Sequence, residues 1–112
     1  MAIMPIYLNK DLHARLDKIA KITGVPKSAL MVISVNHCLI LGNFHVNKIP
    51  TTSGGGRVVM SLRMPDKLKG MITDAAASLS VSASALVNMC AECCYNDYFC
   101  KYADATEKIN KD

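Results

Sequence analysis

The residues with the most reactive side chains are the five cysteines, four of which lie near the end of the chain. Cys90 and Cys93 are three residues apart and are followed by Cys94 and Cys100, so a helix there would gather several thiols. Thiolates at this spacing can share a zinc ion, with His37 as a further ligand. One helix rarely supplies a closed tetrahedral set, however, and paired CxxC sequences are absent. The spacing therefore favours buried thiols, and we expect no metal and no other cofactor.

Catalytic motifs are missing from the sequence. His13, His37 and His45 lie far apart, and none accompanies a recognisable nucleophile or a carboxylate that would orient it. The three glycines that end at Gly56 lack the following Lys-Ser/Thr and the helix start of a phosphate-binding loop. We therefore predict that the protein is not an enzyme.

The composition indicates a globular protein with a basic surface. Among the 112 residues, 51% are hydrophobic and 20% are charged, which is too apolar for a disordered chain, and the net charge of +4 fits a polyanionic partner. The odd number of cysteines is not that of a disulfide framework. The most apolar run, residues 29–41, is shorter than a membrane span and contains Ser34, Asn36 and His37. These features predict a cytoplasmic protein that does not enter a membrane.

The sequence repeats itself at an offset of 56 residues without a gap. Such internal similarity indicates a structural unit present twice. Identical residues match at Met4 and Met60, Leu12 and Leu68, Ala20 and Ala76, Val25 and Val81, Ser28-Ala29-Leu30 and Ser84-Ala85-Leu86, and Cys38 and Cys94.

Each half begins with apolar residues at alternate positions, which predicts a short strand, and continues with the spacing of two helices. Asn9 and Ser82 are suitable N-caps, and Pro65 suits a first helical turn. We predict a first unit at residues 1–41, a flexible linker at 42–56, a second unit at 57–100 and a C-terminal tail at 101–112. Because one strand and two short helices cannot bury their apolar faces alone, the two units should share one core.

This order, with Gly24-Val25-Pro26-Lys27-Ser28-Ala29-Leu30 between the helices and Ser61-Leu62-Arg63-Met64-Pro65 before a first helix, resembles the ribbon-helix-helix superfamily of the Arc and methionine repressors. The similarity covers about residues 3–41 and 58–98. Two copies on one chain are similar to some accessory proteins of conjugative relaxosomes. The resemblance implies a mainly α fold with one short two-stranded antiparallel ribbon, arranged as a pseudo-dimeric tandem ribbon-helix-helix, β-α-α-β-α-α.

The resemblance also implies sequence-selective binding of double-stranded DNA, in a transcriptional regulator or an accessory factor at plasmid or phage DNA. A ribbon in the major groove would read bases with its outward residues. These are Ile3, Pro5, Tyr7, Val59, Ser61 and Arg63. Phosphates would be bound at the starts of the second helices and by nearby cations. The residues in question are Lys27, Ser28, Ser82, Ala83, Ser84, Arg57, Lys67 and Lys69.

The first strand departs from the polar side chains usual in such ribbons, so base reading would fall mainly to Ser61 and Arg63. Pro5 has no N–H, so if it lies opposite Ser61 this pair must be a non-hydrogen-bonded one. The alternative function is a protein-interaction module, antitoxin-like or inhibitory, that keeps the fold without reading DNA. The second helix of the first half, at residues 29–35, is apolar on more sides than one core contact requires. This predicts self-association or a protein partner through the apolar second helices.

Overall fold

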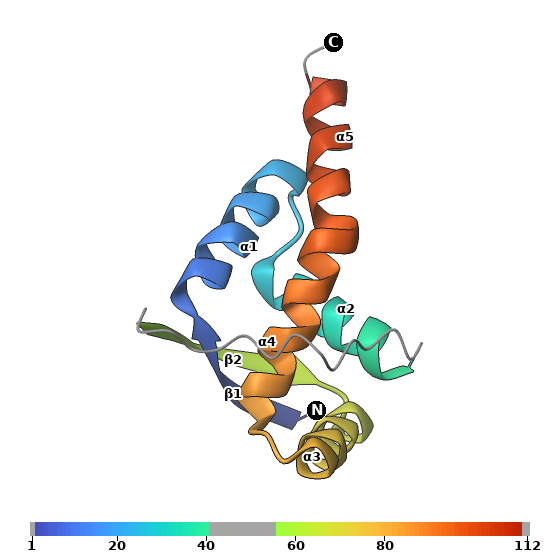
Figure 1. Ribbon diagram of the computed structural model, residues 1–112. Coiled ribbons are helices and arrows are strands. Elements are labelled where there is room, and N and C mark those ends of the chain that lie inside the picture. The colour runs from blue at the N-terminus through green and yellow to red at the C-terminus, as the bar shows by residue number, and fades with distance from the viewer. Residues whose placement is uncertain (1, 41–55, 111–112) are drawn as a thin grey trace.

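A computed structural model describes residues 2–40 and 56–110 (Figure 1). The described chain forms two strands, five α-helices and one π-helical segment. In chain order these are β1 (Ala2–Asn9), α1 (Lys10–Thr23), α2 (Lys27–Ile40), β2 (Arg57–Met64), α3 (Asp66–Leu79), α4 (Ala83–Cys94), η1 (Tyr95–Phe99) and α5 (Cys100–Asn110).

The two strands pair antiparallel along their whole length, from Ala2 opposite Met64 to Asn9 opposite Arg57. Pro5 lies opposite Ser61, so this pair lacks the hydrogen bond that a proline cannot donate. Side chains alternate across the ribbon, which therefore has a buried inner face and an exposed outer face. The fully buried inner residues are Ile6, Leu8, Leu62 and Met64.

Helices α2 and α4 pack against each other and against the inner side of the ribbon, and they form the centre of the molecule. Met31, Val35, Leu86 and Val87 are almost completely buried there. Burial of a side chain of this size contributes about 1.5–3 kcal/mol of hydrophobic free energy. The strands therefore depend on α2 and α4, because an isolated two-stranded ribbon is at best marginally stable in water.

Local sequence sets the helix boundaries. The predicted N-caps are confirmed, since the side chain of Asn9 accepts a hydrogen bond from the Asp11 N–H and that of Ser82 accepts one from the Ala85 N–H. Pro65 stands directly before α3, at its N-cap position. Gly24 ends α1 in a left-handed conformation, and Ser80, which matches it at the offset of 56, ends α3 in the same way.

The predicted β-α-α-β-α-α layout is wrong, because the chain does not end its regular structure with α4. It continues through η1 into α5, so the observed order is β-α-α-β-α-α-π-α. Phe99 and Ala103, four residues apart, are buried where this extension packs against the rest of the molecule, and α5 contacts α1. Figure 1 shows α5 continuing from α4 and rising beyond α1. The two halves are therefore not equivalent units.

The segment 101–112, which the charged sequence suggested as a tail, is helical as far as Asn110. The apolar face of this helix is short, and because polar residues surround it, the helical pattern was not recognised in the sequence. The predicted linker at 42–56 lies outside the described residues except for Gly56, whose carbonyl accepts a hydrogen bond from the Lys10 N–H.

Candidate nucleic-acid interface

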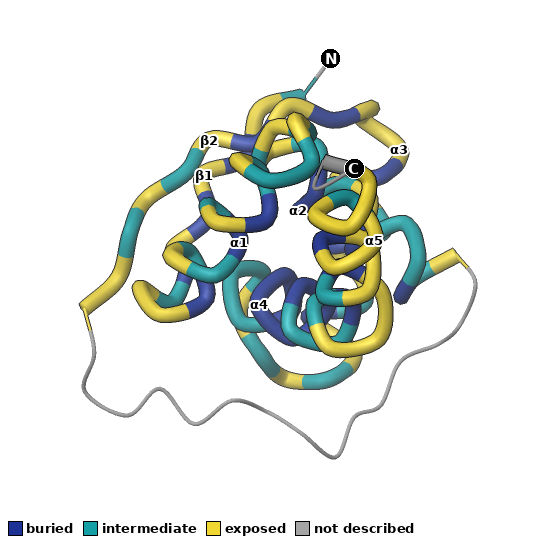
Figure 2. The backbone as a smooth tube through the Cα atoms, turned by 90° about the horizontal axis from the view of Figure 1, so that it is seen from above, coloured by how far each residue is buried: buried dark blue, intermediate teal, exposed yellow. Residues whose placement is uncertain are grey.

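The outer face of the ribbon carries the residues that were predicted to read bases. Figure 2 shows the exposed positions along both strands. All six predicted residues are exposed, and they form three cross-strand pairs: Ile3 with Arg63, Pro5 with Ser61, and Tyr7 with Val59. Ile3, Tyr7 and Val59 remain 54%, 51% and 58% exposed, which is a high value for apolar side chains held on a rigid element.

Side chains of α4 hold the free edge of β1. The Ser84 hydroxyl accepts a hydrogen bond from the Tyr7 N–H at 2.9 Å. The Asn88 side chain accepts from the Asn9 N–H at 2.9 Å and donates to the Tyr7 carbonyl at 3.0 Å. These groups would otherwise be unpaired at a sheet edge. Asn88 is 9% exposed and also donates to the Ser84 carbonyl, so it fixes the position of β1 on α4.

Positive charge lies at both ends of the outer face. Arg57 occupies the same face as Arg63 at the other end of β2, opposite Asn9, and both arginines are exposed. They are six positions apart in one strand, which corresponds to about 20 Å. Lys67 and Lys69 are exposed at the start of α3, directly after β2. Within residues 2–40 and 56–110, none of these four cations forms an ion pair.

The other predicted phosphate ligands lie at the starts of α2 and α4, where several already have partners within the chain. The Lys27 ammonium contacts Asp17 at 3.1 Å and the His13 imidazole at 3.1 Å. Lys27, with Lys21, lowers the pKa of Asp17, so this carboxylate stays charged and competes for Lys27. At the start of α4, the Ser82 and Ser84 hydroxyls each accept a hydrogen bond from a backbone N–H, and Ala83 is half-buried. At the start of α2, Ser28 is exposed.

Three polar residues that position the interface were not among those predicted from the sequence: Asn88, Arg15 and Glu92. The Arg15 guanidinium makes two hydrogen bonds with the Glu92 carboxylate, at 2.9 and 2.8 Å, and lies 4.8 Å from the centre of the Tyr95 ring. The hydrogen bonds with Glu92 raise the pKa of Arg15. The pair ties α1 to α4, which carries the clamp on β1. Of the three, only Asn88 could have been recognised in the sequence, because it is a polar residue at a helix position that faces inward.

The five cysteines lie partly or fully inside the protein. Three are buried, Cys38, Cys90 and Cys94, and two are half-buried, Cys93 and Cys100. The Cys38 thiol donates to the Cys90 carbonyl and the Cys94 thiol to the Ser34 carbonyl, at 3.8 and 3.9 Å. The contact with Cys90, together with burial, raises the pKa of Cys38 to about 12, and the neighbouring Cys38 thiol and burial raise that of Cys94. Both are therefore protonated, unreactive core groups. In the described residues, no three His, Cys, Asp or Glu side chains form a metal-binding cluster.

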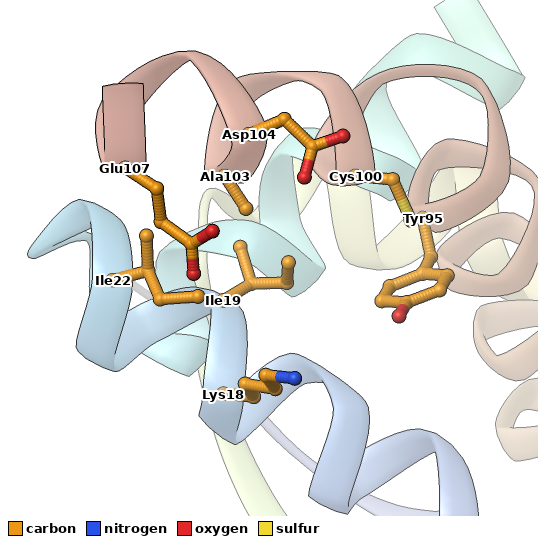
Figure 3. A pocket seen from close by; sticks show the side chains of 8 residues that line it. All are labelled: Lys18, Ile19, Ile22, Tyr95, Cys100, Ala103, Asp104 and Glu107. Atoms are coloured by element: carbon orange, nitrogen blue, oxygen red, sulfur yellow. The ribbon is translucent and has the colours of Figure 1, made fainter. Parts of the chain in front are cut away.

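A small pocket of about 140 Å³ lies between α1 and the η1–α5 segment (Figure 3). Ile19, Ile22 and Ala103 form its apolar part, and Lys18, Asp104, Glu107, Tyr95 and Cys100 complete its lining. The Cys100 thiol and partial burial raise the pKa of Tyr95, which keeps its hydroxyl neutral. None of the predicted site residues belongs to this pocket.

Comparison with family models, with curated proteins and with solved structures finds no match to this chain. The resemblance to the ribbon-helix-helix superfamily therefore rests on the motifs in the sequence. No single helix in the described residues is long and apolar enough to cross a membrane, although α3 and the α4–α5 helix pass that test as a pair bent by 99°.

Proposed function

We propose that this protein binds double-stranded DNA with the outer face of the β1–β2 ribbon. The observation that carries the proposal is the set of exposed residues on one face of a paired, helix-backed ribbon, with Arg57 and Arg63 at its two ends. Two paired strands fit the major groove, which is about 12 Å wide. The helices behind the ribbon keep it in one conformation, so binding would not require ordering of the strands.

Within the groove, the Arg63 guanidinium and the hydroxyls of Ser61 and Tyr7 can form hydrogen bonds with base edges. A guanidinium can donate two hydrogen bonds to guanine, which provides about 1–3 kcal/mol of discrimination. Ile3, Tyr7 and Val59 can contact thymine methyl groups. Because the two strands present different residues, the preferred site of one chain should be asymmetric.

Phosphate contacts would supply most of the affinity. Arg57, Lys67 and Lys69 are exposed beside the ribbon and form no ion pair with the rest of the described chain. Lys27 would have to leave Asp17 before it could reach a phosphate. A small binding protein of this kind fits a transcriptional regulator or an accessory factor at plasmid or phage DNA.

The test is fluorescence anisotropy with a randomised duplex pool at two salt concentrations. Removal of one guanine contact should weaken specific binding by about tenfold or more in Arg63→Ala, and further in Ser61→Ala/Arg63→Ala. Lys18→Ala is the matched control, because it removes one positive charge on α1, away from the ribbon. Binding that is independent of salt, or equal losses in Arg63→Ala and Lys18→Ala, would contradict the proposal.

The exposure of Ile3, Tyr7 and Val59 favours a second candidate, a protein-interaction module with the same ribbon face. Its dependence on salt and on substitutions would be the reverse of that expected for DNA binding. Binding to a protein partner through apolar contacts would change little with salt and would be lost in Tyr7→Ser, whereas Arg63→Ala would have a small effect.

A further inference from the structure

The ribbon has a local two-fold axis that coincides with the repeat in the sequence. In an antiparallel pair of strands such an axis passes between opposite residues and exchanges the two strands. Pro5 lies opposite Ser61, and these two residues are themselves 56 positions apart. The axis at this pair therefore exchanges each residue from Ala2 to Leu8 with the residue 56 positions later in β2.

The inner face of the ribbon has the same chemistry on both sides of this axis. All the exchanged residues of this face are apolar and pack in or against the core of the molecule. They are Met4 and Met60, Ile6 and Leu62, and Leu8 and Met64. The apolar character of the inner face is thus the same at both ends of the ribbon.

The outer face keeps the symmetry at one pair of positions and breaks it at another. Ile3 exchanges with Val59, and both are exposed aliphatic side chains that are branched at Cβ. Tyr7 exchanges with Arg63, so an aromatic ring stands where the other strand has a guanidinium. Both side chains are exposed, and within residues 2–40 and 56–110 Arg63 forms no ion pair. Both are therefore open to a ligand on the outer face.

A DNA duplex also has two-fold axes that exchange its two strands. When the ribbon axis coincides with one of them, exchanged residues meet equivalent bases on opposite DNA strands. Tyr7 and Arg63 each lie two residues from the central pair, which is about 7 Å along the strand. This distance corresponds to about two base pairs, since the rise of DNA is about 3.4 Å. We call the base pairs on the two sides of the centre the arms of the site.

We propose that the DNA target has thymine in both arms but guanine in one arm only, at the position that Arg63 reaches. This inference rests on the proposed binding of DNA by the ribbon. The Arg63 guanidinium can donate two hydrogen bonds to guanine O6 and N7. At the equivalent base of the other strand, Tyr7 offers a ring that contacts a thymine methyl and a single hydroxyl, which cannot form this two-point contact. Ile3 and Val59 present the same aliphatic chemistry to both arms and contact thymine methyl groups there.

Arg57, the other arginine of the outer face, does not restore the symmetry. It lies at the same end of the ribbon as Tyr7, but four residues from Ser61, which is about 13 Å along the strand. Arg63 lies only two residues from Ser61. A base or phosphate bound by Arg57 is therefore farther from the centre of the site than the guanine assigned to Arg63, and it does not occupy the equivalent position.

The first test is selection of bound duplexes from a pool with randomised central base pairs, followed by sequencing. The native chain should select guanine in one arm, whereas Tyr7→Arg, with a guanidinium at both exchanged positions, should select guanine in both. Only the backbone of Tyr7 bonds to Ser84 and Asn88, so the substitution leaves the clamp on β1 in place. Ala14→Arg is the matched control, because it adds the same charge at an exposed position of α1 and should select the native sequence.

The second test is fluorescence anisotropy with the selected duplex, which has one guanine, and with a version that has guanine in both arms. The native chain should bind the second duplex no more tightly than the first, whereas Tyr7→Arg should gain about fivefold or more from the second guanine. Arg63→Tyr should bind the one-guanine duplex about fivefold or more weakly than the native chain. The exchange variant Tyr7→Arg/Arg63→Tyr should recover this binding, because it presents the same two side chains with the arms interchanged. Circular dichroism should show native helix content in every variant.

The outcomes distinguish this inference from the proposed function. A native chain that binds no duplex even at low salt would remove the proposed function, and this inference with it. A native chain that selects guanine in both arms or in neither, or a Tyr7→Arg chain that selects the native sequence, would overturn the one-guanine target while DNA binding stands. An exchange variant that binds no better than Arg63→Tyr would show that the two positions are not equivalent and would overturn it as well.

Discussion

The two helix–strand contacts that support the ribbon occupy matching places in the chain but differ in chemistry. On one side α4 packs against β1, where Ser84 and Asn88 bind the strand edge. On the other side α2 packs against β2, and the residue matching Asn88 at the offset of 56 is Val32, which can form no side-chain hydrogen bond. The edge of β1 is thus held by polar contacts, whereas the position on α2 that matches Asn88 is apolar.

A second difference lies farther from the ribbon. The pair between Arg15 and Glu92 ties α1 to α4, and the Tyr95 ring lies against the guanidinium. The matching residues are Met71 on α3 and Asn36 on α2, which cannot form an ion pair. The contact between α1 and α4 therefore includes an ion pair for which the matching positions on α3 and α2 have no counterpart. We therefore expect the two sides to differ in their tolerance to substitution, although their hydrophobic patterns are similar.

The largest expected effect concerns the clamp on β1. Asn88→Ala removes the partner of the Asn9 N–H and of the Tyr7 carbonyl, and should lower the free energy of unfolding by about 2–3 kcal/mol. Val32→Ala removes only part of a half-buried side chain and should cost about 1 kcal/mol. Urea denaturation of the two variants measures the difference. Equal losses of unfolding free energy in the two variants would show that the hydrogen bonds of Asn88 contribute nothing beyond the packing of its side chain.

A smaller effect is expected from the link between α1 and α4. Glu92→Gln should destabilise the protein by about 1 kcal/mol, since a two-point contact between Arg15 and a carboxylate is stronger than an ordinary surface ion pair. Lys21→Ala, which breaks an exposed pair with Asp17, should cost less than about 0.5 kcal/mol. A double-mutant cycle with Arg15→Ala and Glu92→Ala isolates the coupling energy. A coupling energy no larger than that between Lys21 and Asp17 would show that the pair of Arg15 and Glu92 does not stabilise the contact between α1 and α4 more than a surface ion pair does.

The smallest effect compares the two left-handed helix ends. Ser80 has φ of 56° with a side chain, so Ser80→Gly should stabilise the chain by about 0.5 kcal/mol after the entropic cost of glycine. Gly24 has φ of 80°, and Gly24→Ala should destabilise it by about 1 kcal/mol although no atom lies within 4 Å of the new Cβ. Thermal unfolding of both variants checks the opposite signs. A stabilising Gly24→Ala would show that conformational strain does not govern these positions.

Much of the local structure followed from the sequence. Alternating apolar residues marked both strands and which side chains face outward, and Asn9 and Ser82 marked helix starts through hydrogen bonds that span only two or three residues. The missing N–H of proline predicted that a pair of Pro5 with Ser61 would be a non-hydrogen-bonded one, and the two residues do lie opposite each other. These features depend on neighbours in the chain or on periodicity, so the residues themselves determine them.

The tertiary structure decided the features that depend on residues far apart. Asn88 acquires its role because β1, about 80 residues earlier, presents its edge there, and Lys27 is paired because α1 and α2 bring Asp17 and His13 beside it. The helical extension through η1 to α5 is stabilised by the burial of Phe99 and Ala103, and this departs from the predicted layout. Hydrogen bonds and burial between distant segments require the folded arrangement of both partners, which no local pattern specifies.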